Sequence, residues 1–244
     1  MNALAGRVAL VTGASGGIGG ALARRLATAG VRLALGYAGH REAAEALAVE
    51  IRRAGGEAIA SGADLSRAES PAAQVAEVQQ RLGQLDILVA NAGVADRREW
   101  PDVTIADFDR ALAVNLRAPV LAAQAALPGM VERKFGRVLF VSSVAAFTGG
   151  IVGPHYAASK AGLHAITAFL SRRLAREGVT VNAIAPALIE DTRMFAGQAS
   201  QLAAMIPAGR LGRSDEVAAL AMAILENGYM TGQVVGIDGG MHPR

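Results

Sequence analysis

Residues 8–19 read Val-Ala-Leu-Val-Thr-Gly-Ala-Ser-Gly-Gly-Ile-Gly, a short apolar run that leads into a glycine-rich turn. Consecutive apolar residues are typical of a strand buried on both faces, as in parallel sheets. The four glycines between positions 13 and 19 let the backbone turn sharply and approach an anion without a Cβ in the way. The N–H groups of a helix that starts there attract a diphosphate. An ordinary strand–helix turn is the alternative, but the position after a first strand favours dinucleotide binding.

Short apolar runs alternate with helix-length segments along the rest of the chain. The predicted strands cover residues 8–11, 32–35, 58–61, 87–90, 138–141, 180–184 and 234–237. Because each parallel pair needs a covering crossover, this pattern predicts one α/β domain over residues 1–244. The expected architecture is a doubly wound Rossmann fold of about seven parallel strands, flanked by helices on both faces. Two helix starts are marked by the caps Thr104 and Ser214, each followed by acidic residues.

Composition excludes several classes of function. Of the 244 residues, 52% are hydrophobic, which is enough for one large core, and none is cysteine, so disulfides and Cys-ligated zinc are excluded. The four histidines have no metal-ligand spacing, so no metal is expected. The net charge of +3 is dispersed without a basic stripe, which argues against nucleic acid. With no signal-peptide pattern and no apolar run of about 20 residues, a cytoplasmic protein without a membrane partner is expected.

The spacing Gly-x-x-x-Gly-x-Gly from Thr12 to Gly19 resembles the TGxxxGxG fingerprint of the short-chain dehydrogenase/reductase family. Further segments similar to family motifs follow in order along the whole chain: Asp64-Leu65, Ala90-Asn91-Ala92-Gly93, Asn115, Ser143, Tyr156, Lys160 and Asp238-Gly239-Gly240. The pattern looks most like the bacterial 3-oxoacyl-[acyl-carrier-protein] reductases. The resemblance implies an NAD(P)-dependent oxidoreductase that passes a hydride between a nicotinamide and a carbonyl or alcohol.

The segment Tyr156-Ala-Ala-Ser-Lys160 matches the family's chemical centre. On a helix this spacing places Tyr156 and Lys160 on one face, with about 5–6 Å between their Cβ atoms. A nearby ammonium favours the phenolate, so it is expected to lower the pKa of Tyr156 from about 10 and suit it to act as general acid or base. A half-buried tyrosine beside a surface lysine is the alternative. Because Lys134 and Lys160 are the chain's only lysines among 24 cations, a compact ammonium at position 160 supports the catalytic interpretation.

The resemblance assigns three further roles. Lys160 also hydrogen-bonds the nicotinamide ribose, Ser143 holds the substrate oxygen, and Asn115 positions a water that links Lys160 to solvent. Ser142 is a rival of Ser143, but the family's spacing to the tyrosine selects Ser143. Ser143 follows a predicted strand and Tyr156 opens the next helix, so both are expected at the carboxyl edge, where ligands bind to open parallel sheets.

The residues after the second predicted strand bear on the choice of nicotinamide cofactor. They read Gly36-Tyr-Ala-Gly-His-Arg41, without the carboxylate that binds the ribose 2′-hydroxyl of NAD. His40 or Arg41 is available to a 2′-phosphate, although Arg41 also suits a solvated helix start. These residues predict a preference for NADP(H) over NAD(H). The full set of predicted cofactor-binding residues is Gly13, Ser15, Gly16, Gly17, Ile18, Gly19, Tyr37, Arg41, Asp64, Leu65, Asn91, Ala92, Gly93, Tyr156, Lys160, Pro186, Ile189 and Thr192.

The segment after the sixth predicted strand resembles the family's PGxIxT stretch, which touches the nicotinamide and the diphosphate. Here Ala187 replaces the glycine, and the threonine falls one place late, at Thr192. A lid is expected at about 188–206, with a helix from 194 to 206 whose apolar stripe serves packing or the substrate pocket. That stripe consists of Met194, Phe195, Leu202, Met205 and Ile206. With the uncharged loop 147–155, it predicts an apolar pocket.

By resemblance, the leading hypothesis is NADPH-dependent reduction of a 3-oxoacyl thioester, either free or carried on an acyl carrier protein. The alternatives are another apolar alcohol or ketone (polyketide, steroid-like or sugar-derived) and a non-catalytic, cofactor-sensing protein. An acidic carrier needs a basic landing site. The candidate residues, which also suit a solvated surface, are Arg133, Lys134, Arg137, Arg172, Arg173 and Arg176. The resemblance also implies a homotetramer packed through the Asn115 and Tyr156 helices and the C-terminal strand.

Overall fold

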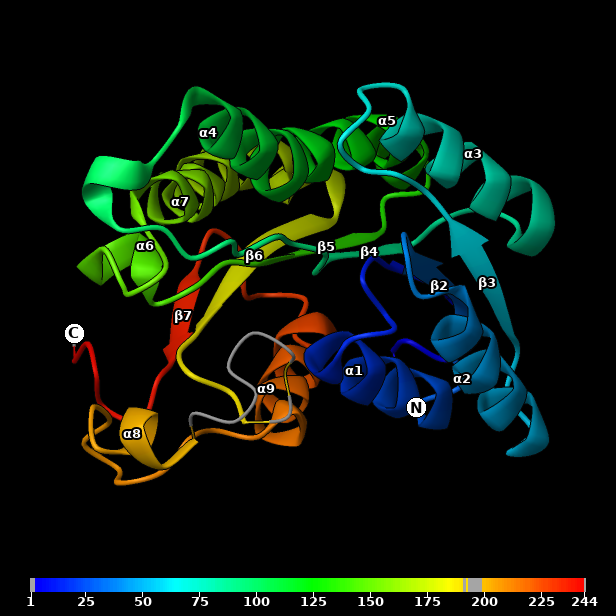
Figure 1. Ribbon diagram of the computed structural model, residues 1–244. Helices are drawn as coiled ribbons and strands as arrows, with labels where there is room; N and C mark the ends of the chain where they lie inside the picture. Colours follow the sequence, from blue (N-terminus) through cyan, green and yellow to red (C-terminus); the bar gives the residue numbers. More distant parts are fainter. Residues whose placement is uncertain (1–2, 191, 193–198, 244) are drawn as a thin grey trace.

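The computed structural model describes residues 3–190, 192 and 199–243, and its strands form one parallel sheet with the order β3-β2-β1-β4-β5-β6-β7 (Figure 1). The strands are β1 Val8–Val11, β2 Arg32–Tyr37, β3 Ala58–Gly62, β4 Ile87–Ala90, β5 Gly136–Val141, β6 Val179–Pro186 and β7 Val234–Ile237. The predicted doubly wound sheet is therefore confirmed. The strand order reverses between β1 and β4, which is where such sheets open a crevice for ligands.

Four strands (β2, β3, β5 and β6) extend beyond the predicted apolar runs because pairing with a neighbour, rather than hydropathy, determines where a strand ends. At the carboxyl end of β6, Pro186 pairs with Ile237 of β7, two residues beyond the predicted limit at Ile184. At the amino end of β5, Gly136 pairs with Val179. The extension of β6 carries Pro186 to the carboxyl edge of the sheet.

Helices cover both faces of the sheet (Figure 1). On one face lie α1 Gly17–Thr28, α2 Arg41–Arg53 and α9 Ser214–Glu226; on the other lie α3 Ser70–Leu82, α4 Ile105–Leu112, α5 Ala118–Glu132 and α7 Pro154–Leu174. The short elements are η1 Trp100–Asp102, the π-helical turn η2 Ala113–Arg117, α6 Ala145–Thr148, η3 Ala175–Glu177 and α8 Ala199–Ala203. None of the helices in these described ranges is long and apolar enough to cross a bilayer.

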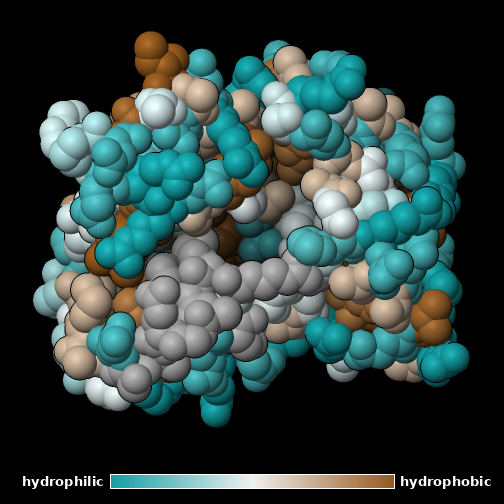
Figure 2. All heavy atoms as spheres, in the orientation of Figure 1, coloured by the Kyte–Doolittle hydropathy of each residue, from teal (hydrophilic) through white to brown (hydrophobic). Residues whose placement is uncertain are grey.

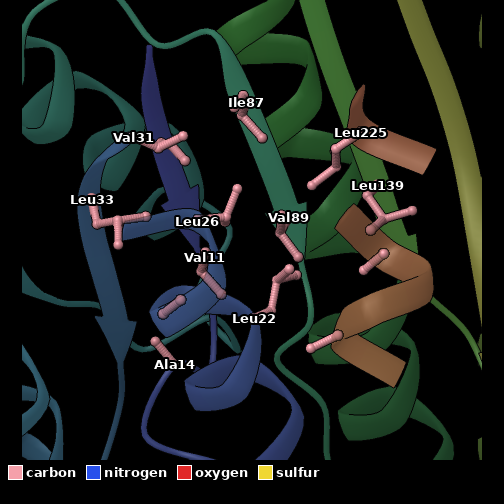
Figure 3. Packing of buried hydrophobic residues seen from close by; sticks show 14 of the residues in the cluster. Val11, Ala14, Leu22, Leu26, Val31, Leu33, Ile87, Val89, Leu139 and Leu225 are labelled. Carbon is pink, nitrogen blue, oxygen red and sulfur yellow. The ribbon is translucent and has the colours of Figure 1, made fainter. Parts of the chain in front are cut away.

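Alternate residues of each strand pack into different cores, which explains why the strands are apolar without interruption. Val11 belongs to the cluster beneath α1 and α9, whereas its neighbour Leu10 belongs to the cluster beneath α5 and α7. Figure 3 shows the first cluster, in which Leu22 of α1 and Leu225 of α9 approach the sheet from the same side. Each such side chain contributes about 1.5–3 kcal/mol through burial. These two layers hold the carboxyl ends of the strands in place.

The predicted helix caps have different outcomes. Thr104 caps α4 in a full capping box with Asp107, as predicted. The predicted cap at Ser214 is wrong by one residue, because α9 already begins there and its N-cap is Arg213. The backbone N–H of Arg213 donates to the carboxylate of Glu216 at 2.8 Å. This bond gives the backbone N–H of the N-cap residue an acceptor within the first turn of α9.

The lid is described only in part. Its base is attached to the rest of the fold by a bridge between Ile189 and Gly212. Of the predicted helix from 194 to 206, residues 194–198 lie outside the described residues and α8 covers 199–203, so the helix ends three residues earlier than expected. Met194 and Phe195 lie outside the described residues. Leu202 and Ile206 are buried in one small apolar cluster.

Candidate active site

A cavity of about 700 Å³ opens along the carboxyl edge of the sheet. Figure 2 shows it as the hollow near the centre of the face, with apolar residues visible inside. Every predicted cofactor-binding residue lines this cavity except Arg41, whose guanidinium is exposed and pairs with Glu45 at 2.7 Å. His40 lines the cavity instead. The structure therefore brings together residues from all parts of the chain that the sequence singled out.

The glycine turn fits a diphosphate because side chains have no room there. Gly13 has a φ of +66°, and a Cβ on it would lie 2.9 Å from Cα of Ala92. A Cβ on Gly19 would lie 2.4 Å from the carbonyl oxygen of Gly13. The first turn of α1 has no acidic residue, and its N-cap, Gly16, makes no side-chain cap. Its N–H groups therefore face the cavity mouth as an anion site.

Thr12 couples the two turns at the crevice, a role that the sequence analysis did not assign. Its Oγ1 accepts hydrogen bonds from the backbone N–H groups of Asn91 and Ala92, both at 3.0 Å. In return, Nδ2 of Asn91 donates to the carbonyl oxygens of Thr12 and Gly13 at 3.0 and 3.1 Å. The threonine of the fingerprint was the available signal. These bonds hold the β1 and β4 turns at a fixed separation.

The far end of the cavity fits the adenosine part of a dinucleotide. Tyr37, His40, Asp64 and Leu65 line it. The Asp64 carboxylate accepts hydrogen bonds from the hydroxyl and the backbone N–H of Ser66 at 2.7 and 3.0 Å, which lower the pKa of Asp64. Asp64 is therefore held by its own loop. Tyr37 at the end of β2 and the three residues that follow it, up to His40, line the cavity, and none of them carries a carboxylate.

The structure brings Ser143, Tyr156 and Lys160 together at the carboxyl end of β5. The side chain of Ser143 adjoins the Tyr156 hydroxyl closely enough to act on its pKa. Nζ of Lys160 donates to the carbonyl oxygen of Val141 at 2.8 Å and lies 5.9 Å from the centroid of the Tyr156 ring. Ser142, the rival candidate, donates its hydroxyl to the carbonyl oxygen of Lys160 at 3.0 Å. Ser142 thus supports α7, whereas Ser143 faces the tyrosine.

The expectation that Lys160 lowers the pKa of Tyr156 is wrong for this structure. Burial of the tyrosine raises its pKa above the ordinary value, and the hydrogen bond with Ser143 opposes the rise. Burial also lowers the pKa of Lys160 to about 8. Both shifts have the same cause, because removal from water disfavours the charged form of each group. The centre therefore holds a protonated phenol at neutral pH.

Asn115 connects the loop after β4 to α7 and does not line the cavity. It lies in the π-helical turn η2, a type of irregularity that is frequent at functional sites. Its Oδ1 accepts from the N–H of Val94 at 2.8 Å, and its Nδ2 donates to the carbonyl of Val94 and to Oγ of Ser159. A Cβ on Gly93 would lie 3.2 Å from Asn115 Oδ1 and 3.3 Å from Lys160 Nζ. Asn115 is therefore a positioning residue, and its water-binding role stays a prediction.

The substrate end of the cavity is mainly apolar, as predicted. Its apolar lining consists of Val94, Ala95, Val114, Val144, Ala145, Ile151, Val152, Leu188, Met205 and Met241. Sequence reasoning missed Met241, which reaches the cavity from the segment after β7. It also missed Arg110 of α4, which lines the cavity and pairs with Asp96 at 2.9 Å. No group of three or more metal-binding side chains occurs within the described ranges.

The two basic clusters considered for a carrier protein lie away from the cavity. Lys134 pairs with Glu177, and Arg137 is buried and donates to the carbonyl oxygen of Leu225. Lys134 lies just before β5 and Arg137 lies at its start, about 20 Å along the strand from Ser143. The cluster 172–176 follows Tyr156 by more than four turns of α7, or about 24 Å. Neither cluster adjoins the cavity mouth within one chain.

The lowered pKa of Lys160 is directly measurable, because the chain has only two lysines. With 13C at the lysine Cε atoms, NMR titration is expected to show a midpoint of about 8 for Lys160. Lys134→Arg identifies which of the two signals belongs to Lys160. Because the folded pKa lies below the ordinary 10.5, the unfolded chain binds more protons between these values. This contribution to stability therefore rises with pH across that window. A midpoint near 10.5 would show that Lys160 is solvated.

Comparison with known proteins agrees with this geometry. The family profile described as short chain dehydrogenase matches residues 7–203. A 3-oxoacyl-[acyl-carrier-protein] reductase from Synechocystis sp. is 35% identical over 244 residues, which cover 99% of each chain. Another from Pseudomonas aeruginosa is 37% identical over 253 residues, which cover 98% of each chain. A solved structure, a blue fluorescent protein from a metagenomic library in complex with NADPH, matches with a TM-score of 0.92 and 34% identity over 100% of both chains.

Proposed function

The chain belongs to the short-chain dehydrogenase family and is an NAD(P)-dependent oxidoreductase, and from this premise we propose that it reduces 3-oxoacyl thioesters with NADPH. The single observation that carries the proposal is the shared cavity. The glycine turn lies at one end, and Ser143 and Tyr156 lie beside an apolar pocket at the other. The similarity to 3-oxoacyl-[acyl-carrier-protein] reductases supports the substrate class.

The reaction converts a 3-oxoacyl thioester, NADPH and a proton into a 3-hydroxyacyl thioester and NADP⁺. When bound, the cofactor supplies the hydride. Ser143 donates a hydrogen bond to the substrate's ketone oxygen, and Tyr156 donates the proton that the new alkoxide needs. Burial raises the pKa of Tyr156, so the proton is present at neutral pH. Lys160, charged below pH about 8, lies beside this centre, with its Nζ 5.9 Å from the centroid of the Tyr156 ring.

Preference for NADPH is the first expected result. Wild-type protein with a short 3-oxoacyl thioester should show a kcat/KM at least about tenfold higher with NADPH than with NADH. The reason is that the loop after β2 offers His40, and no carboxylate, to the ribose. Glu45→Gln, which releases Arg41 from its ion pair, should strengthen this preference. A lower KM for NADH would contradict the cofactor assignment.

The same assay tests the substrate class. A coenzyme A or N-acetylcysteamine thioester is the first choice, because the basic clusters do not adjoin the cavity mouth; a carrier-bound thioester is the second. Turnover that consumes one NADPH per hydroxyacyl product supports the proposal. Failure with all 3-oxoacyl thioesters, together with turnover of another apolar ketone, would move the substrate to that class. Turnover of no ketone by protein that binds NADPH would favour a cofactor-sensing role.

We also propose that the protein is a cytoplasmic homotetramer, in keeping with the family resemblance. Large apolar side chains are exposed around α4 and α7: Trp100 is 75% exposed, Ile105 82% and Phe169 53%. Exposed apolar patches of this kind are typical of protein–protein contacts. Their position supports packing through the helices that carry Asn115 and Tyr156.

A further inference from the structure

The segment 238–243, which follows β7, turns back over the substrate end of the cavity. The carboxylate of Asp238 fixes this turn by accepting from the N–H groups of Gly240 and His242 at 2.9 and 3.2 Å. Gly239 lies in the left-handed region, with a φ of +61°. Met241 thereby lines the cavity and packs against the apolar cluster of α8 and the lid base. In Figure 1 this segment lies between α6 and α8.

An aromatic stack holds this segment against the loop after β5. The ring of His242 is stacked on Phe147 of α6, with 5.0 Å between centroids and 12° between planes. Phe147 also contacts the ring of His164 on α7 at 4.6 Å. These separations are in the range of favourable aromatic pairs. Three elements around the pocket are therefore joined at one place.

The inner end of the stack is anchored on the catalytic helix. The hydroxyl of Ser142 has one hydrogen, which it donates to the carbonyl oxygen of Lys160. It must therefore accept a hydrogen bond from Nε2 of His164, which lies 2.8 Å away. His164 thus presents its ring to Phe147 in an orientation set by the end of β5 and by the turn of α7 that carries Lys160.

We propose that the segment 238–243 is the wall of the substrate pocket that selects the acyl chain. Met241 supplies the surface that the chain contacts, and the stack of His242, Phe147 and His164 fixes the position of that surface. The inference rests on the proposed function and deepens it, since it assigns recognition of the apolar acyl group to residues outside the lid. Methionine suits this task because its flexible side chain adapts to unbranched alkyl groups.

The test is a series of straight-chain 3-oxoacyl thioesters of increasing length, with KM and kcat measured for each. Met241→Ala should raise KM for the shortest substrate by about tenfold and shift the optimum toward longer chains, because a buried methylene contact is worth about that factor. His242→Ala should raise KM across the series, with kcat within about twofold and the KM for NADPH unchanged. His242→Phe keeps a ring for the stack and should restore values close to wild type. Tyr229→Phe, at a side chain that is 98% exposed and lies outside both the segment 238–243 and the cavity lining, is the control.

Two results would overturn the inference. One is an equal effect of Met241→Ala on every chain length, and the other is a His242→Phe variant that behaves like His242→Ala. The same variants assayed with straight-chain methyl ketones separate this inference from the proposed function. A shifted length optimum with ketones, but no activity with thioesters, would support the wall and refute the thioester substrate. An unshifted length optimum in both series would refute the role of the segment 238–243 and leave the proposed function intact.

Discussion

Tyr156→Phe is expected to lower kcat for ketone reduction by about a thousandfold while leaving the affinity for NADPH close to wild type. Phenylalanine keeps the ring and its packing but lacks the proton that the forming alkoxide needs. The tyrosine is only 5% exposed, so water has little access to replace it as donor. Single-turnover kinetics measure the chemical step, and fluorescence titration measures cofactor affinity.

The chain offers a matched control for this substitution. Tyr229 is 98% exposed, and Tyr229→Phe should leave both kcat and NADPH affinity unchanged. Retention of most of the wild-type rate by Tyr156→Phe would mean that another group donates the proton. Loss of cofactor binding in the same variant would instead show a role for the hydroxyl in the fold of the site.

Gly19→Ala is expected to weaken NADPH binding by about a hundredfold or more. The added Cβ would lie 2.4 Å from the carbonyl oxygen of Gly13 and 2.7 Å from Nδ2 of Asn91, so the backbone turn and its bond to β4 must both shift. Overpacking of this kind costs about 1–3 kcal/mol. The displaced N–H groups would then no longer converge on the diphosphate. Calorimetric titration with NADPH measures the loss.

Two further glycine variants make this result specific. Gly39→Ala lies in the lining of the same cavity, but its Cβ would have nothing within 4 Å, so cofactor affinity should be unchanged. Gly16→Ala would meet only the carbonyl oxygen of Gly13, at 3.4 Å, and should have an intermediate effect. Circular dichroism shows whether each variant is folded. Equal NADPH affinity in folded Gly19→Ala and Gly39→Ala would contradict the diphosphate assignment.

Much of the architecture follows from local pattern, because strands buried on both faces must be apolar and each parallel pair needs a crossover. The glycine turn could be predicted because close approach to an anion and positive φ both require glycine, as Gly13 shows. The grouping of Ser143 with Tyr156 and Lys160 could also be predicted from the sequence, because residues that follow the strands of one parallel sheet meet at one edge.

Other features depend on tertiary contacts that no local pattern contains. The pKa of Tyr156 is determined by burial, and the sequence shows only the neighbouring lysine. Asn115 could be identified, but not its bonds to Val94 and Ser159, which depend on the π-helical turn. Met241 reaches the pocket because the segment after β7 folds back over it. None of these contacts has a sequence spacing that identifies it.

Direct transfer of hydride is the measurement that tests ketone reduction at this site most directly. The protein is incubated with a short 3-oxoacyl thioester and NADPH that carries deuterium at the transferable position of the nicotinamide, and the product is analysed by mass spectrometry and NMR. The expected result is one deuterium on the carbinol carbon of the 3-hydroxyacyl product, formed by wild-type protein and Tyr229→Phe but not by Tyr156→Phe. NADPH consumption without deuterium at that carbon, or equal labelling by Tyr156→Phe, would contradict reduction through the Ser143–Tyr156–Lys160 centre.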